Sequence, residues 1–488
     1  MKRLLKYVQK IVIQLTVVVF VLAGNMAKAQ YPYEFSLAGN PYDTKTIVRS
    51  YDHERVVVYY EDVGVRYVAL VNVISNAVHK VQLSTDYVMN DMCIMNDSVF
   101  LCGRRYYSGN NVGGCIIAMN IDSFYTSSVR VEEYSPSYWM NLNLKRIKNF
   151  EYVYGSYNLR YAKFLMVADI EYACDGSEPF PTNLFPGHFY TDLNDHSRCT
   201  ANAVVEVSYP FTRFVSNSPT IQKVIRFMNP LNHSEIIHDV VVTDNYVAFV
   251  GIETETTDYI TLHICNRGDN ILNGNHFTST FNNYYKYPLS TGNGSPFYHA
   301  CALDGDNIAI VTQDELSTSS NDITIRTFDL TTHTMTNKQY LLCNTHPYFK
   351  DVAYIPDLRR LVLLYHGYFR STGNFCDIFC TVDPYGSGSY MLPAITDNVF
   401  HIKFNSLDAM KGGYFISTGG KFGLAADASM FAPGKMCYDE EDRTIVSREL
   451  INAVFGDFDY DQHLSHPLID SMNVEPTYMV LPTACIEH

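Results

Sequence analysis

The chain is acidic and rich in tyrosine, and both features narrow the classes of protein to which it can belong. Its 488 residues include 51 Asp and Glu against 36 Lys and Arg, a net charge of −15 that argues against nucleic acid and anionic membranes as partners. With 38 Tyr, 28 Phe, a single Trp and few long helical patterns, the composition favours an all-β chain.

The first 29 residues have the pattern of a secretory signal peptide. Basic residues between Lys2 and Lys10 precede an apolar run over 11–24 and a small-x-small cleavage site at 27–29. That run is shorter than the roughly 20 residues of a membrane span, and no later run approaches this length. We therefore expect a mature chain that starts near Gln30, has no membrane span and is exported to the periplasm or the extracellular space.

A strand–turn–strand pattern at 238–251 recurs along the chain. Two apolar runs there flank an Asp244-Asn245 turn, and further strand-like runs such as 259–264 follow them. Seven copies align, with first residues at Ile47, Asn90, Arg146, His238, His299, Lys350 and His401. Their starts lie mostly 43 to 61 residues apart, but 92 residues separate Arg146 from His238, so this interval must hold an insertion.

Four strands per copy, with an inner pair that is apolar on both faces, are typical of a β-propeller blade. Seven copies favour seven four-stranded blades, and six or eight blades remain compatible with the irregular third copy and C-terminus. Turn sequences such as Asn96-Asp97, 304–306 and Pro356-Asp357 fall where a tight reversal is required. The chain resembles secreted seven-bladed β-propeller proteins of bacteria in architecture, although it lacks the signature motifs of the characterised propeller classes.

The predicted organisation is a signal peptide at 1–29, an N-terminal extension at 30–43, a propeller at 44–450 and a C-terminal segment at 451–488. Within the propeller, residues 171–200 are rich in Pro, Gly, Asn and Asp, which predicts a long loop over one face.

Cysteines and chain ends leave two further points open. Cys174 and Cys199 could clamp the loop at 171–200 by a disulfide, since an exported chain meets an oxidising compartment. A ring must also be closed somewhere, because otherwise one blade exposes an edge. The C-terminal run 478–481 is the best candidate for this closure, and the segment 31–37 is the alternative.

If the copies are blades, their first residues gather around one mouth of the central channel. The candidate ligand-binding residues there are Asn90, Arg146, His238, Asp239, His299, Lys350 and His401. Such side chains suit an anionic or polar ligand, and His238, His299 and His401 could instead hold a divalent metal. The alternative interpretation is that channel mouths are wet, so that innermost strands simply begin with polar residues.

No familiar catalytic motif occurs, whether a Gly-x-Ser-x-Gly elbow, a His-Glu-x-x-His pair or a phosphate-binding glycine loop. The acidic run at 457–461 lacks the glycine and the closing glutamate of a calcium loop. The sequence therefore favours a non-enzymatic scaffold that binds a protein or glycan through one loop face. A polysaccharide hydrolase or lyase with its site at the channel mouth is the alternative.

Overall fold

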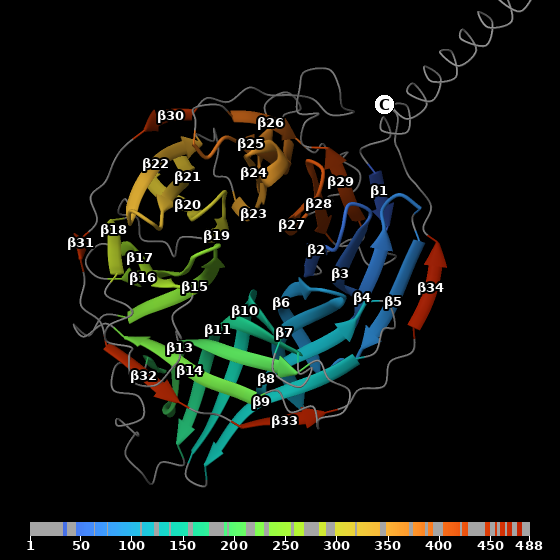
Figure 1. The fold of residues 1–488 in the computed structure, drawn as a ribbon, viewed down its shortest axis with the longest axis vertical. Helices are drawn as coiled ribbons and strands as arrows, with labels where there is room; N and C mark the ends of the chain where they lie inside the picture. The colour runs from blue at the N-terminus through green and yellow to red at the C-terminus, as the bar shows by residue number, and fades with distance from the viewer. Residues whose placement is uncertain are drawn as a thin grey trace, which may run out of the picture.

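The structure, a computed structural model, is built from β-strands arranged in a ring (Figure 1). It describes the segments 33–36, 45–174, 190–210, 220–228, 234–267, 283–288, 298–341, 348–393, 404–427, 445–448 and 454–480, with short gaps inside several of them. Among these residues no helix is long and apolar enough to cross a membrane.

The described strands form successive antiparallel groups. The first group comprises β2 (Thr46–Ser50), β3 (Arg55–Asp62), β4 (Val65–Asn72) and β5 (Ala77–Leu83). The second comprises β6 (Tyr87–Met95), β7 (Ser98–Tyr107), β8 (Asn110–Asn120) and β9 (Thr126–Ser135). The third comprises β10 (Tyr138–Tyr154), β11 (Arg160–Cys174), β13 (Asp195–Pro210) and β14 (Thr220–Met228), with the short β12 (Tyr190–Asp192) beside β13.

The later groups repeat this order. The fourth comprises β15 (Ser234–Val242), β16 (Tyr246–Thr254), β17 (Asp258–Asn266) and β18 (Asn283–Pro288). The fifth comprises β19 (Tyr298–Ala302), β20 (Asn307–Ser317), β21 (Ser320–Asp329) and β22 (Thr334–Leu341). The sixth comprises β23 (Tyr348–Ile355), β24 (Arg360–Phe369), β25 (Asn374–Val382) and β26 (Ser389–Pro393). The last comprises β27 (Ser406–Met410), β28 (Tyr414–Gly419) and β29 (Phe422–Asp427), which β1 (Tyr33–Ser36) joins as the outermost strand.

The first strand of each group lies innermost, and these strands contact one another around the ring. β2 contacts β6, β6 contacts β10, and the series continues through β15, β19, β23 and β27 back to β2 (Figure 1). The second and third groups also share one sheet, since β9 pairs with β10. Radial antiparallel groups around a common centre are a β-propeller, so the predicted fold class is confirmed.

The second strand of a group is buried on both faces because neighbouring groups cover it from both sides. In β3, Val57 and Tyr59 pack with apolar residues of β6, β7 and β8. The alternate residues Val56, Val58 and Tyr60 pack with β27 and β28 of the last group. All five side chains are at most 1% exposed, which explains why the sequence reads as a continuous apolar run and not as an alternating one.

The C-terminal segment adds strands to the outer edges of five groups, in the reverse of chain order (Figure 1). These additions are β30 (Ile445–Arg448) on β22, β31 (Val454–Phe455) on β18, β32 (Asp459–His463) on β14, β33 (His466–Asp470) on β9 and β34 (Pro476–Val480) on β5. β34 therefore extends the first group as a fifth strand. The N-terminal β1 instead completes the last group by pairing with β29.

Two predicted segments differ from the structure. β11 extends to Cys174 and β13 begins at Asp195, so both ends of the predicted loop at 171–200 are strand, while 175–189 lie outside the described residues. The last hairpin is formed by β27 and β28 around Gly412 and Gly413, whose φ angles are 88° and 86°. Its first strand begins at Ser406, five residues after the predicted start at His401, which lies outside the described residues.

Candidate functional site

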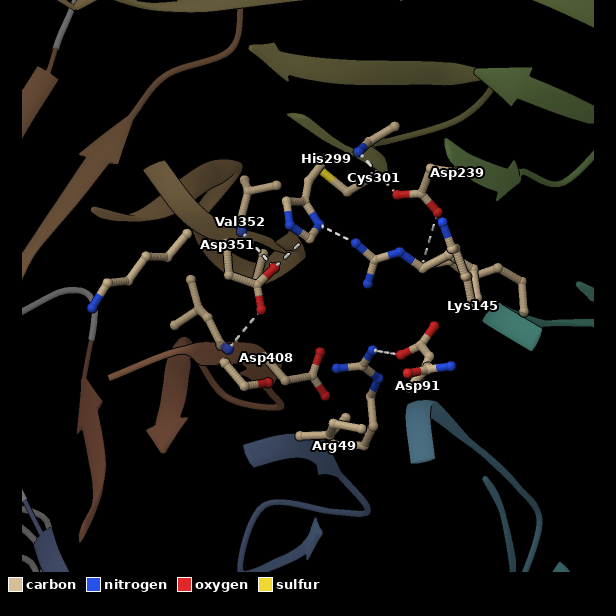
Figure 2. A pocket seen from close by; sticks show the side chains of 18 of the residues that line it. Arg49, Asp91, Lys145, Asp239, His299, Cys301, Asp351, Val352 and Asp408 are labelled. Atoms are coloured by element: carbon tan, nitrogen blue, oxygen red, sulfur yellow. Dashed lines mark hydrogen bonds and ion pairs between the residues drawn. The ribbon is translucent and has the colours of Figure 1, made fainter. Parts of the chain in front are cut away.

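Four innermost strands carry a β-bulge at corresponding positions. The pairing register of β6, β10, β15 and β23 with their neighbours skips Asn90, Lys145, His238 and Lys350, respectively. A bulge locally redirects side chains and is over-represented beside functional sites. The four bulged residues and the residue that follows each of them line one cavity, of about 720 Å³, at the centre of the ring (Figure 2).

All of the described candidate residues from the sequence lie on this cavity wall. They are Asn90, Arg146, His238, Asp239, His299 and Lys350, whereas His401 lies outside the described residues. The wall also contains Asp91 and Asp351, which directly follow aligned first residues as Asp239 does. It further contains charged residues for which the alignment gave no signal, namely Lys45, Arg49, Lys145, Lys148 and Asp408. Lys145 precedes the aligned first residue Arg146 by one position, as expected when a bulge shifts the repeat register.

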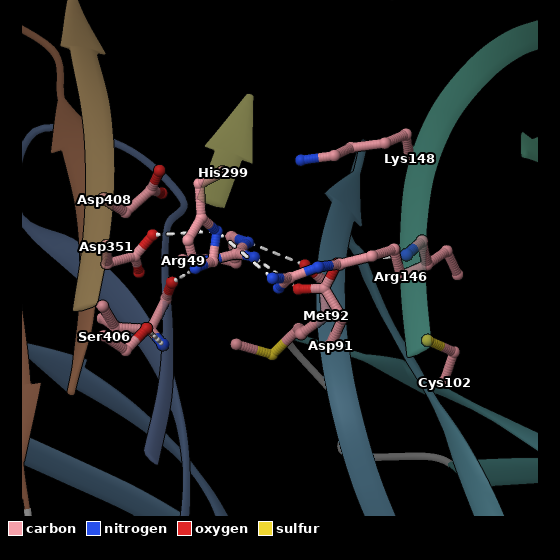
Figure 3. A network of polar contacts seen from close by, with 12 residues as sticks. Arg49, Asp91, Met92, Cys102, Arg146, Lys148, His299, Asp351, Ser406 and Asp408 are labelled. Carbon is pink, nitrogen blue, oxygen red and sulfur yellow. Dashed lines mark hydrogen bonds and ion pairs between the residues drawn. The ribbon is translucent and has the colours of Figure 1, made fainter. Parts of the chain in front are cut away.

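Charged side chains from several groups form a network of polar contacts in the cavity (Figure 3). The Arg49 guanidinium pairs with Asp91 and also donates from Nε to the Met92 carbonyl oxygen at 2.7 Å. Arg146 Nη2 lies 3.2 Å from His299 Nδ1, which in turn lies 3.7 Å from Asp351 Oδ1. Cationic and acidic residues thus alternate over part of the ring.

The aspartates that follow the bulges tie neighbouring groups together. Asp239 accepts the Val240 N–H at 2.9 Å with one oxygen and the Ala300 N–H of the next group at 3.1 Å with the other. Asp351 does the same with Val352 and Leu407, at 2.8 and 2.9 Å. These carboxylates satisfy buried backbone donors of two strands at once, which gives the predicted ligand residue Asp239 a structural role.

Other candidate residues are likewise held by partners. The Asn90 amide donates to Asn143 Oδ1 and to the Leu144 carbonyl oxygen, both at 2.8 Å, and so links β6 to β10. Lys350 Nζ donates to Asp377 Oδ1 and to the Phe404 carbonyl oxygen, both at 2.6 Å. The amide of Asn90 and the ammonium of Lys350 therefore already form hydrogen bonds within the propeller.

Two aspartates on opposite sides of the network titrate differently. Burial favours the neutral form of Asp91, but the charges of Arg49 and Arg146 outweigh it and lower the pKa of this carboxyl. For Asp351 burial prevails over Arg49 and raises the pKa to about 6. Burial also raises the pKa of Asp408, for which no ion pair with a described residue is found.

The two described histidines of the cavity are neutral at pH 7. Desolvation in the cavity and the charges of Lys145 and Arg146 lower the pKa of His238 to about 4. Burial and the charges of Arg146 and Lys148 take the pKa of His299 well below its ordinary value. Neutral imidazoles are competent metal ligands, but the described residues contain no group of three or more His, Cys, Asp and Glu that could hold an ion.

The predicted disulfide concerns side chains outside the described part of the structure. The backbone places Cys174 at the end of β11 and pairs Cys199 with Tyr172 of the same strand. The bridge therefore stays a prediction. Cys93, Cys102 and Cys115 are buried free thiols, as apolar strand positions favour.

The ring of paired strands around a lined cavity places the chain among the β-propeller proteins. No protein family matches it, and no curated protein matches it significantly. Similar solved structures include the WD40 domain of coronin from Toxoplasma gondii, at 9% identity over 81% of this chain and 85% of that one, with a TM-score of 0.35. A variant of the NanB sialidase from Streptococcus pneumoniae gives 7% identity over 82% and 71%, with a TM-score of 0.31. Likenesses this distant carry no argument about function.

Proposed function

We propose that the protein is a secreted, non-enzymatic binding propeller whose central cavity receives an anionic group of a glycan or protein ligand. The charge of the cavity wall carries this proposal. Among the described residues that line the cavity, six are Lys or Arg, four are Asp and none is Glu, although the whole chain has a net charge of −15. A positive concave site on an acidic protein concentrates anions from solution, because low-dielectric walls focus the field.

The β10 side of the cavity offers the best position for the anion. Lys145, Arg146 and Lys148 all come from this strand, and Figure 3 shows Lys148 extending toward the channel. Lys148 Nζ lies 3.9 Å from Asp239 Oδ1 and makes no hydrogen bond with a described residue. An ammonium in this state can bind a ligand oxygen without first breaking a hydrogen bond. The cavity volume of about 720 Å³ also falls within the usual range for small-molecule sites.

Replacement of Lys148 tests the proposal. Lys148→Met keeps an unbranched side chain one atom shorter and removes the charge, so we expect binding of acidic glycans or acidic peptides to weaken by about tenfold or more. The measurement is a binding array followed by titration calorimetry of the strongest ligand at two salt concentrations. Lys411→Met, at an exposed turn between β27 and β28, is the matched control and should bind as the unaltered protein does. Equal binding by all three proteins would contradict the proposal.

A polysaccharide hydrolase or lyase is the second candidate, and the titration of Asp351 favours it. A carboxyl with a pKa of about 6 is protonated often enough near neutrality to act as a general acid, and His299 lies beside it. In this case acidic polysaccharides should release new chain ends, and Asp351→Asn should abolish the release. Binding of the polysaccharide without any release of chain ends would contradict the enzymatic candidate and support the binding function.

Export of the chain is also proposed, from the signal-peptide pattern of its first 29 residues. The mature protein isolated from the periplasm or the medium should begin at or near Gln30. Retention of the first 29 residues in the isolated protein would contradict export by cleavage.

A further inference from the structure

The cavity is polarised across the ring. Lys145, Arg146 and Lys148 lie on the β10 side, whereas Asp351 and Asp408 belong to β23 and β27. Lys350 also belongs to β23, but its ammonium is bound by Asp377 and the Phe404 carbonyl oxygen. Figure 3 shows Asp351 and Asp408 on one side of the network and Arg146 and Lys148 on the other, with Arg49 and His299 between them. A ligand that enters from the mouth therefore meets positive charge on one wall and acidic groups on the opposite wall.

The acidic wall lacks a close cationic partner. Asp351 accepts two backbone N–H groups and lies near the neutral His299, and Asp408 accepts the Ser50 N–H at 2.6 Å. Among the described residues, neither carboxyl has a Lys or Arg nitrogen within 4.0 Å, whereas Asp91 is paired with Arg49. A desolvated carboxylate without a cation is costly, so a cationic group that arrived with the ligand would be stabilised there.

We propose that the ligand is dipolar, with its anionic group bound on the β10 side and an ammonium or guanidinium group bound by Asp351 and Asp408. The chemistry fits an amino acid, a peptide segment with both charges or an amino sugar acid. This inference rests on the proposed binding function and adds the cationic half of the ligand. It also gives the acidic residues on the wall a role that an anion site alone does not explain.

A matched set of small probes tests the inference on the full mature protein. The probes are ω-amino acids from 4-aminobutanoate to 8-aminooctanoate, each compared with the carboxylic acid and the amine of the same length. Titration calorimetry at pH 7.5 and low salt should show that one ω-amino acid binds about tenfold or more tightly than its matching acid and amine, because only the dipolar probe uses both walls. The preferred length then reports the separation of the two walls.

Variants separate the two halves of the site. Asp351→Asn combined with Asp408→Asn should reduce the affinity for the best ω-amino acid to that for its matching acid, while binding of the acid persists. Lys148→Met should weaken both. Asp244→Asn, at an exposed turn, is the matched control and should leave all affinities unchanged. If the double variant fails to fold, the pKa of Asp351 in the unaltered protein provides the second readout. Binding of the best ω-amino acid should lower this pKa, whereas binding of the matching acid should not.

The outcomes distinguish the two proposals. Equal affinity of the protein for an ω-amino acid and its matching acid at every length would overturn the dipolar ligand and leave the anionic site standing. If the amine binds more tightly than both the ω-amino acid and the carboxylic acid of the same length, the assignment of the β10 side as the anion site is overturned. If no probe binds up to about 10 mM and the array of acidic glycans and peptides is also negative, both proposals fail.

Discussion

Asp91 and Asp351 show how one position in a repeat acquires opposite electrostatics. Each follows a β-bulge, and each accepts a backbone N–H from the next group, Asp91 from Ile147 and Asp351 from Leu407. The difference lies in their neighbours, because the Arg49 guanidinium pairs with Asp91 and is too far from Asp351 to offset burial. The close pair with Arg49, together with the charge of Arg146, therefore makes Asp91 the more readily ionised of the two carboxyls.

The titration of Asp351 predicts a pH-dependent contribution to stability. The pKa of an unfolded Asp is about 3.9, whereas burial raises the pKa of Asp351 in the folded chain to about 6, so the folded state binds the proton more tightly between these values. The free energy of unfolding therefore falls as the pH rises from about 4 to 6, by on the order of 3 kcal/mol for this group. Denaturant unfolding of Asp351→Asn between pH 4 and 7 should show a gain relative to the unaltered protein that grows with pH by about this amount.

Asp91→Asn is the control for this comparison. The pKa of Asp91 is lowered in the folded chain, so its stabilising contribution is present above the pKa of the unfolded carboxyl and is lost only at lower pH. Its difference from the unaltered protein should stay constant between pH 5 and 7, where Asp91 is ionised in both states. Identical pH profiles for Asp351→Asn and the unaltered protein would show that burial does not raise the pKa of Asp351.

At the scale of elements, the bulge is the feature that the sequence revealed only indirectly. Alignment of the apolar runs found Asn90, His238 and Lys350 because each directly precedes the regular part of its strand. It placed the third copy at Arg146 and so passed over Lys145, since an inserted residue has no signature of its own in a degenerate copy. Arg49 was missed because it lies inside an apolar strand pattern, where its contact with the neighbouring group depends on the ring.

The cross-group hydrogen bonds of the bulge aspartates are expected to stabilise the ring. Asp239→Ala would leave the buried N–H groups of Val240 and Ala300 without their acceptor, at a cost of about 1–3 kcal/mol each. We expect the variant to unfold at a lower temperature and at a lower denaturant concentration, with a loss of about 2–5 kcal/mol. Thermal and denaturant unfolding measure this loss.

Asp244→Ala is the matched control, because this aspartate lies at the exposed turn of the same hairpin. Its stability should stay within about 0.5 kcal/mol of the unaltered protein. Asp239→Asn keeps one carbonyl oxygen as acceptor and should fall between the two. Equal stabilities for Asp239→Ala and Asp244→Ala would show that the bridges between the groups contribute nothing.

At the scale of the whole molecule, the propeller followed from periodicity, whereas the course of the C-terminal segment could not be read from the sequence. The inner strands can be recognised in the sequence because packing on both faces requires apolar residues throughout. The added strands β30 to β34 pair with outer edges through backbone hydrogen bonds, which hardly constrain residue type. The sequence offered 478–481 as a strand, and the structure places β34 on β5.

The outer strands predict a graded response to truncation. Removal of residues 471–488 takes away β34 and should accelerate amide hydrogen exchange at the freed edge of β5 alone, because its edge N–H groups then face water. Removal of residues 445–488 should extend the acceleration to β9, β14, β18 and β22, the other strands that receive an added partner. The inner strands β16 and β20 should retain their protection, and β29, which pairs with β1, serves as the internal control in both variants. If removal of residues 471–488 accelerates exchange in all groups, the C-terminal segment holds the ring together as a unit. If exchange in β5 is unchanged, β34 does not pair with β5 in solution.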